Sequence, residues 1–261
     1  MMFRQIRIRF DTEKNVRPHY YWAYDLYSAL IEKVSPDLAV DLHNDGLKPV
    51  SHYLLLPGRQ NGVPGGMTWV INLLGKDTID EIFPIIASLE SLHLRHYGTS
   101  LRVSEMAAGP VIQEKDFVAG HLLNEQNSGG LRLQFLTPTS FKSSEEYQIF
   151  PSIEWIVKSS VQKWNAYSRE TVIDDPEAVE QLITYSRISG YSLKSYHYRL
   201  KGIKIPGFMG YINLEVRGPK PLVRLYNMLI SFLAYSGVGI KCSLGMGGCA
   251  VDPLSGQRTP D

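Results

Sequence analysis

The chain has 261 residues, enough for two domains of ordinary size that each bury a hydrophobic core. Its 27 basic and 26 acidic side chains leave a formal net charge of +1, which excludes a strong overall attraction to nucleic acid or anionic membranes. A polyanion would therefore have to bind at a local patch. The two cysteines, Cys242 and Cys249, form no CxxC motif and adjoin no cluster of metal ligands, which argues against a zinc site or a disulfide framework.

The N-terminal segment MMFRQIRIRFD does not have the pattern of a signal peptide, because Arg4, Arg7 and Arg9 interrupt its apolar residues. No later stretch of about 20 apolar residues is long enough to cross a membrane. The chain also shows no metal-binding cluster and no cofactor-binding motif. We therefore expect a cytoplasmic protein that uses no metal or other cofactor and has no membrane partner.

Hydrophobic periodicity in the first half changes from strand to helix and back. Residues 3–10 alternate between apolar and charged side chains, as in a half-buried strand. The following apolar residues recur at helical spacing and end at Ser35-Pro36, where proline disfavours a continuing helix. A second helix is expected to open at Asp77 or Thr78. The predicted elements are a strand at 3–10, a helix at 20–34, a hairpin of strands at 49–57 and 66–75, a helix at 79–89 and a strand at 100–111.

The second half repeats this order with one additional helix. Leu131, Leu133 and Phe135 alternate with polar residues, and an amphipathic helical pattern follows in FPSIEWIVKSSVQKWN. The additional helix has Asp175 at its N-cap and proline in its first turn. The predicted elements are a strand near 131–135, helices within 150–165 and 174–190, strands at 192–205 and 207–218 hinged at Pro206-Gly207, a helix at 222–233 and a strand at 248–252.

Each half thus has the order β-α-β-β-α-β, which is the ferredoxin-like unit with an antiparallel sheet and two helices on one face. We predict an α+β protein of tandem ferredoxin-like, RRM-like domains. The polar segment NEQNSGG, residues 124–130, is the predicted linker. The N-terminal domain is placed at 1–125 and the C-terminal domain at 126–261.

The segment GVGIKCSLGMGG, residues 237–248, is rich in glycine and follows an apolar helical pattern. It lacks the GxxxxGK[ST] spacing of a P-loop and the GxGxxG spacing of a dinucleotide site, and both motifs need a strand before a helix. One interpretation is a helix C-cap at Gly237 followed by a surface loop. The other is a backbone that approaches a ligand closely, in which a buried Lys241 would suit a phosphate.

The pattern GxGxKxxxGxG in this segment resembles the glycine-rich loop of repeat-associated RNA-binding proteins, in particular the CRISPR-associated endoribonuclease family, CRISPR-associated protein 6. The matching positions are Gly237, Gly239, Lys241, Gly245 and Gly247. LTPTSF and the helix in FPSIEWIVKSSVQKWN also resemble the family. The resemblance implies a metal-independent endoribonuclease that cleaves CRISPR repeat RNA in the precursor transcript to give guide RNAs with a 5′-hydroxyl and a 2′,3′-cyclic phosphate.

This reaction needs a base that takes the proton of a ribose 2′-hydroxyl and a cation beside the phosphate. Histidine suits the first role, because its ordinary pKa of about 6.5 lies near working pH. His43 lies in the polar segment DLHNDGLKPV, expected to be a loop, where the family keeps its catalytic histidine. The resemblance further implies Lys48 as an electrostatic helper and Tyr27 as a catalytic tyrosine, although Tyr27 also fits core packing. His52 is the rival base, on a strand face shared with leucines.

The remaining histidines carry no comparable pattern. His93 and His96 are expected at the end of the second helix, where a cation complements the helix dipole. His19, His121 and His197 adjoin no other catalytic candidates. His43 therefore remains the first candidate for the base.

The binding of RNA must come from clustered cations and stacking side chains. The family grips its substrate with the second domain, which here implies the glycine-rich loop and a basic hairpin. The candidate hairpin residues are Lys194, Arg199, Lys201 and Lys204. The implied partner is CRISPR repeat RNA, and contacts with proteins of a CRISPR interference complex and a homodimer are left open.

Two alternatives remain open at this stage. One is a non-catalytic repeat-RNA-binding subunit of an interference complex with the same tandem fold. The other is a small-molecule enzyme on a ferredoxin-like scaffold, since fold does not fix function, and it predicts a deep apolar pocket instead of a basic groove.

Overall fold

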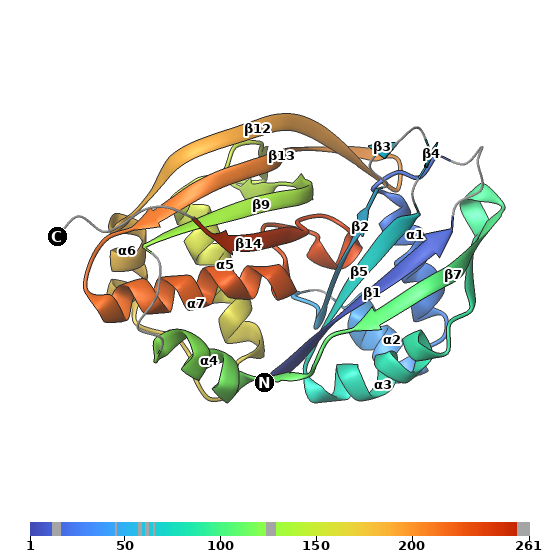
Figure 1. The fold of residues 1–261 in the computed structure, drawn as a ribbon, viewed down its shortest axis with the longest axis horizontal. Helices are drawn as coiled ribbons and strands as arrows, with labels where there is room; N and C mark the ends of the chain where they lie inside the picture. Colours follow the sequence, from blue (N-terminus) through green and yellow to red (C-terminus); the bar gives the residue numbers. More distant parts are fainter. Residues whose placement is uncertain are drawn as a thin grey trace.

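The computed structural model describes residues 1–11, 17–44, 46–56, 59–60, 63–64, 66–123 and 129–254. Two antiparallel sheets lie beside each other, with helices packed on one side of each (Figure 1). Most of the predicted linker lies outside the described residues, so the division at 125 and 126 remains a prediction. No helix among the described residues is long and apolar enough to cross a membrane.

The first sheet has the strand order β2-β5-β1-β7-β6, with β8 also paired to β1. Its helices are α1 (Trp22–Ile31), α2 (Pro36–His43) and α3 (Lys76–Ala87). The strands are β1 (Met2–Asp11), β2 (Val50–Leu55), β5 (Met67–Leu74), β6 (Ser91–Leu94), β7 (Thr99–Ala108) and β8 (Ile112–Gln113), with a separate small pair β3 (Arg59–Gln60) and β4 (Val63–Pro64).

The second sheet has the strand order β12-β13-β9-β14. Its strands are β9 (Gly130–Thr139), β12 (Ser186–Leu200), β13 (Ile203–Val216) and β14 (Cys249–Pro253), and a separate pair is formed by β10 (Phe141–Ser143) and β11 (Glu146–Gln148). Its helices are α5 (Ile153–Tyr167), α6 (Pro176–Thr184) and α7 (Lys220–Ser236). In both sheets the first strand of the unit lies between the third and the fourth, so the predicted tandem ferredoxin-like architecture is confirmed.

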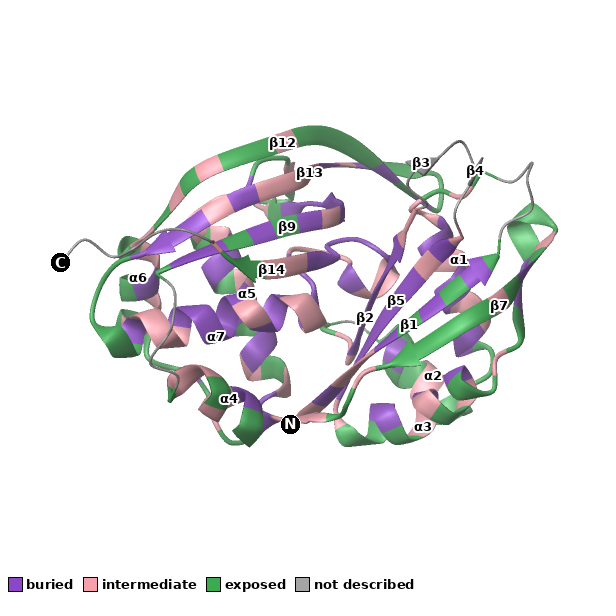
Figure 2. Cartoon of the chain, viewed as in Figure 1, coloured by how far each residue is buried: buried purple, intermediate pink, exposed green. Residues whose placement is uncertain are grey.

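Local signals place several element ends correctly. The side chain of Asp175 accepts a hydrogen bond from the amide of Glu177 at the start of α6, as its predicted N-cap role requires. The alternation of apolar residues in β1 buries Ile6, Ile8 and Phe10 completely (Figure 2). The helix α3 begins at Lys76 after Gly75, however, so the predicted start at Asp77 or Thr78 is one to two residues late.

Two predicted segments are wrong. Ser35-Pro36 ends no long helix but begins α2: the Ser35 hydroxyl accepts from the Leu38 amide, and proline occupies the first turn, where its missing N–H costs nothing. His43 is therefore the last residue of a helix and does not lie in a loop. The second error concerns α3, which ends at Ala87, so that His93 lies in β6 and His96 in the 3-10 turn η1 (Arg95–Tyr97).

The long hairpin of the second half turns at Lys201-Gly202, not at the predicted Pro206-Gly207. Both turn residues have positive φ, of 48° and 80°, as a tight connection between twisted strands requires. Pro206 and Gly207 continue β13 opposite His197 and Tyr196. Because the turn comes earlier, β12 and β13 form one continuous ribbon that reaches over to the first half (Figure 1).

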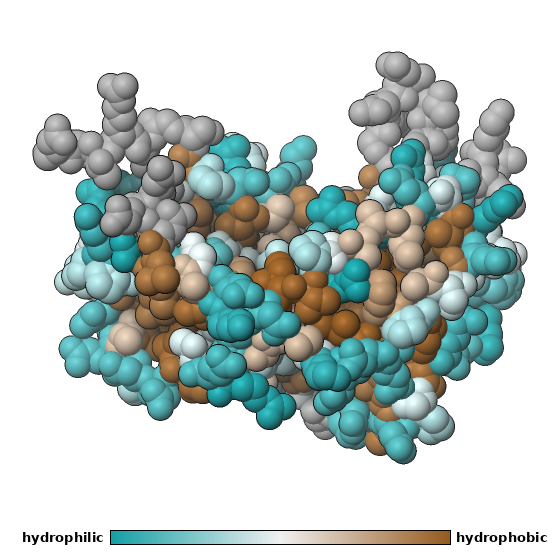
Figure 3. All heavy atoms as spheres, turned by 60° about the horizontal axis from the view of Figure 1, so that its bottom comes forward, coloured by the Kyte–Doolittle hydropathy of each residue, from teal (hydrophilic) through white to brown (hydrophobic). Residues whose placement is uncertain are grey.

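The two halves share buried contacts. The tip of the β12–β13 ribbon contributes Tyr198 and Leu200 to a small apolar cluster that also contains Tyr20 and Tyr24 of the first half. A further helix, α4 (Glu114–Leu122), places Phe117 in the core beneath the second sheet. On the helical side, which comes forward in Figure 3, hydrophobic residues show between hydrophilic ones in the middle of the molecule.

Candidate active site

A cleft of about 1050 Å³ lies where the two halves meet. Its walls come from α1, the end of α2 with the segment after it, the end of α5, the tip of the β12–β13 ribbon and the glycine-rich segment. It contains six of the candidate site residues: Tyr27, His43, Lys48, Lys201, Gly239 and Lys241. Candidates that are far apart in the sequence are therefore brought to one place.

His43 is exposed at the rim of this cleft. Its Nδ1 lies 2.6 Å from the carbonyl oxygen of Ala39, one turn earlier in α2. A carbonyl can only accept, so Nδ1 carries the proton and the neutral ring leaves the lone pair on Nε2. The helix end thus orients the imidazole and presents Nε2 as a base.

Lys48 follows at the cleft wall, and its Nζ donates to the backbone carbonyl of Asp41, 3.2 Å away. The hydroxyl of Tyr167, at the end of α5, donates to the backbone carbonyl of Lys48. These two bonds tie the segment after α2 to its own helix and to the second half. Lys48 is therefore placed close to the His43 end of α2, as the sequence predicts.

Tyr27 and His52 stack on each other, with ring centroids 4.7 Å apart. The hydroxyl of Tyr27 is buried without a hydrogen-bond partner among the described residues, and burial raises its pKa. His52 is fully buried: Nε2 lies 2.8 Å from the Ser243 carbonyl, and Nδ1 accepts from the indole N–H of Trp69 at 3.2 Å. His52 therefore has no free nitrogen for a substrate, and the catalytic role of Tyr27 stays a prediction.

The glycine-rich segment packs tightly between the two halves. A Cβ on Gly245 would lie 2.5 Å from the Cβ of Ala23 in α1 and 2.6 Å from the Tyr198 hydroxyl, and one on Gly248 would lie 2.2 Å from Tyr53 in β2. Only glycine allows these approaches. Gly245 is also in a left-handed conformation, with φ of +94°. The segment is therefore a packing bridge between the halves, with Lys241 half-buried at the cleft, not fully buried.

The two other matching motifs lie against each other. The carbonyl of Pro138 accepts from the Gly247 amide at 3.0 Å, and that of Ser140 accepts from the Ile240 amide at 3.0 Å. The segment LTPTSF thus hydrogen-bonds the glycine-rich segment directly, and a Cβ on Gly239 would meet the Ser140 carbonyl oxygen at 2.3 Å. Most amides of the glycine-rich segment are engaged within the protein in this way.

The basic hairpin divides into two sets. Lys201, at the turn, lines the cleft, and its Nζ lies 5.3 Å from the centre of the Tyr24 ring. Arg199 and Lys204 face each other across the strands, on exposed positions outside the cleft. Lys194 is exposed further along β12 and is also outside the cleft. The structure therefore groups only Lys201 with the histidine.

Charge in the cleft is predominantly positive among its described lining residues. Four lysines line it: Lys48, Lys163, Lys201 and Lys241. The acidic lining residue is Glu32, whose carboxylate pairs with Arg95 at 2.9 Å. No group of three potential metal ligands gathers among the described residues. The cleft therefore suits a polyanion.

Lys163 is a site residue that sequence reasoning missed. It is buried, and its Nζ donates to the Gly237 carbonyl at 2.8 Å and contacts the Cys242 sulfur at 3.0 Å. The signal was available, because Lys163 lies seven residues after the buried Ile156 and so falls on the apolar face of α5. A lysine at such a position needs a polar partner.

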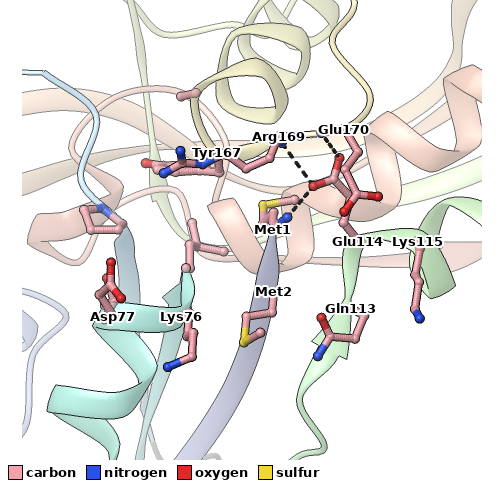
Figure 4. A pocket seen from close by; sticks show the side chains of 15 residues that line it. Met1, Met2, Lys76, Asp77, Gln113, Glu114, Lys115, Tyr167, Arg169 and Glu170 are labelled. Atoms are coloured by element: carbon pink, nitrogen blue, oxygen red, sulfur yellow. Dashed lines mark hydrogen bonds and ion pairs between the residues drawn. The ribbon is translucent and has the colours of Figure 1, made fainter.

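A second pocket, of about 700 Å³, lies at the helical side of the junction and contains Glu114 (Figure 4). Burial would raise the pKa of this carboxyl, but hydrogen bonds from the Met1 amine, the Ser168 hydroxyl and the amides of Arg169 and Glu170 outweigh it and lower the pKa to about 2. Glu114 thereby joins β1, α4 and the segment after α5.

Solved structures of similar fold cover nearly the whole chain. A structure described as a Cas6 product complex superposes with a TM-score of 0.78 at 20% identity, covering 97% of this chain and 100% of the other. Thermus thermophilus Cas6 gives a TM-score of 0.73 at 22% identity, covering 96% and 98%. Fold and cleft together define a tandem ferredoxin-like protein with a glycine-rich loop at the junction of its halves.

Sequence comparisons specify the family. The family model described as CRISPR-associated endoribonuclease Cas6 matches residues 133–249. A Streptococcus thermophilus protein of that description is 28% identical over 234 residues, covering 88% of this chain and 91% of the relative. A Mycobacterium tuberculosis protein of that description is 28% identical over 238 residues, covering 88% and 71%. The chain belongs to the CRISPR-associated endoribonuclease Cas6 family, as its motifs predict.

Proposed function

We propose that this protein is an endoribonuclease that cuts CRISPR repeat RNA within a precursor transcript, with His43 as the general base. The observation that carries the proposal is the geometry of His43: its Nδ1–H donates to Ala39, and its Nε2 is left free at a lysine-lined cleft. The family membership supports repeat RNA as the substrate.

In this proposal the Nε2 atom of His43 takes the proton of a ribose 2′-hydroxyl. The oxygen then attacks the adjacent phosphorus, and the bond to the 5′-oxygen breaks. The products are a 2′,3′-cyclic phosphate and a 5′-oxygen that leaves as a hydroxyl after gaining a proton. A positioned general base contributes typically 10²–10⁴-fold to such a step. Lys48 adds positive charge close to the reacting phosphate, where negative charge develops.

The remaining lysines of the cleft hold the RNA in this proposal. Lys201 and Lys241 approach from the hairpin turn and the glycine-rich segment, on the side of the second half. Because most amides of the glycine-rich segment are engaged within the protein, its contact with phosphate rests on Lys241. Gly237, Gly239, Gly245 and Gly247 shape the segment that carries it. Lys194, Arg199 and Lys204 lie outside the cleft and would bind more distant parts of the RNA.

The test is single-turnover cleavage of the repeat RNA encoded nearest the gene, in the presence of a chelator. His43→Ala is expected to lower the cleavage rate at least about 100-fold and to leave the dissociation constant within about threefold, because the base is lost while the lysines remain. His121→Ala is the matched control, since that histidine lies in α4 outside the cleft.

A second substrate tests the chemistry. An RNA with deoxyribose at the nucleotide before the cut should bind and remain intact; cleavage of this strand would refute the internal nucleophile. A wild-type protein that binds repeat RNA and never cuts it would favour the non-catalytic subunit. A cytoplasmic location, contacts with interference-complex proteins and a homodimer belong to the same proposal and are tested by copurification and by measuring the mass in solution.

A further inference from the structure

Three buried side chains hold the short helical turn η2 (Cys242–Leu244), which lies inside the glycine-rich segment. Each contacts a different one of its three consecutive residues. Lys163 Nζ contacts the Cys242 sulfur at 3.0 Å, His52 Nε2 lies 2.8 Å from the Ser243 carbonyl oxygen, and the Tyr198 hydroxyl lies 2.6 Å from the Leu244 carbonyl oxygen.

These side chains, His52, Lys163 and Tyr198, are called the loop anchors below. They are 0%, 4% and 1% exposed. A buried polar group without a partner is strongly unfavourable, so each anchor and its partner stabilise each other's burial. The tautomer of His52 is determined as well: the Trp69 indole can only donate to Nδ1, so Nε2 carries the proton that Ser243 accepts.

The loop anchors come from both halves of the molecule. His52 lies in β2 of the first sheet, whereas Lys163 lies in α5 and Tyr198 in β12 of the second half. Lys163 also donates to the Gly237 carbonyl, where α7 ends. The turn η2 is therefore the point at which polar contacts from both halves converge.

Lys241 immediately precedes η2 and has φ of +56°, a left-handed conformation that is uncommon for lysine. Such a conformation persists where the surroundings determine it. The Lys241 carbonyl accepts from the amides of Leu244 and Met246, at 2.9 and 3.3 Å, so its backbone is fixed to the turn that the anchors hold.

We infer that the loop anchors are positioning residues that fix η2 so that Lys241 is directed at RNA in the cleft. This inference rests on the proposed function for the role of Lys241. None of the three anchors contacts RNA in this scheme; each acts through the backbone of η2. Loss of an anchor should therefore weaken RNA binding through Lys241 and leave the chemical step at saturating RNA nearly unchanged.

The test uses Tyr198→Phe, which removes one oxygen, with Tyr226→Phe as the control, a tyrosine equally buried in the core of the second half. The ligand is repeat RNA with deoxyribose before the cut. Tyr198→Phe is expected to raise the dissociation constant about tenfold, which corresponds to one lost buried hydrogen bond, with single-turnover cleavage within about threefold at saturating RNA. Tyr226→Phe should leave both values within about twofold.

A double-mutant cycle with Lys241→Ala shows whether the effect passes through Lys241. In the Lys241→Ala background, Tyr198→Phe should change the dissociation constant less than about twofold. Independent, additive effects would overturn the inference. His52→Gln, which keeps a donor for Ser243, should bind RNA better than His52→Leu, which has none; equal binding by the two would also overturn it.

Amide hydrogen exchange of the free protein separates this inference from the proposed function. Tyr198→Phe should speed exchange at residues 240–248 and leave the first sheet unchanged, and unchanged exchange at this segment would overturn the inference. If exchange rises as expected while the wild-type protein binds no repeat RNA, the proposed function is refuted and the structural role of the anchors stands.

Discussion

Acid should destabilise this protein through His52, the anchor that joins β2 to the glycine-rich segment. Burial lowers the pKa of His52 to about 4, although its hydrogen bond to the Ser243 carbonyl acts in the opposite direction. In the unfolded chain the imidazole has its ordinary pKa of about 6.5. Between these values the unfolded state binds a proton that the folded state does not, so stability falls as the pH falls. Each pH unit costs about 1.4 kcal/mol, and going from pH 6.5 to pH 5 costs about 2 kcal/mol.

His52→Gln isolates this contribution, because glutamine cannot titrate and keeps an N–H for Ser243. Urea unfolding at pH 7.5, 6.0 and 5.0 gives the free energy of unfolding for both proteins. The variant should be less stable at pH 7.5 by about 1–3 kcal/mol, since the packing on Tyr27 and the bond from Trp69 are disturbed. The gap should then narrow by about 2 kcal/mol at pH 5. Equal pH dependence in the two proteins would refute the assignment of His52 as a buried neutral ring.

Two further substitutions test the junction of the halves. Gly245→Ala should lower the free energy of unfolding by about 3 kcal/mol, through contact with Ala23 and the left-handed backbone, whereas Gly120→Ala, in an open helical position, should cost nothing in a thermal melt. Glu114→Gln should cost about 3 kcal/mol at pH 7 and remove the loss of stability that the wild type shows as pH falls from 4.5 towards 2, because the lowered pKa of the carboxyl is gone; an unchanged acid limb would contradict this.

The architecture follows closely from local patterns. Alternation in β1 and the helical spacing of α5 and α7 are signals of nearest-neighbour geometry, and each core face could be assigned from them. The element α2 could not, because Ser-Pro is compatible both with the end of one helix and with the N-cap and first turn of the next. The choice depends on the packing of Leu42 in the first core, which local sequence does not show.

The site was predictable only in part. The strand face of His52 follows from alternation, but its partner Ser243 is 191 residues away and is reached only when the two halves pack. The same holds for the Tyr167 hydroxyl and the Lys48 carbonyl. Periodicity reports which side of an element is buried and carries no information about which distant carbonyl a buried donor will meet.

The ribbon of β12 and β13 limits how substrate can enter. Its tip is attached to the first half by Tyr198, which contacts the backbone oxygens of Leu244 and Tyr20, and by Lys201 over the ring of Tyr24. Swinging the halves apart would break these contacts together. A guide precursor therefore has to slide in sideways along an already formed gap, so the width of that gap, set before any encounter, filters which strands are accepted.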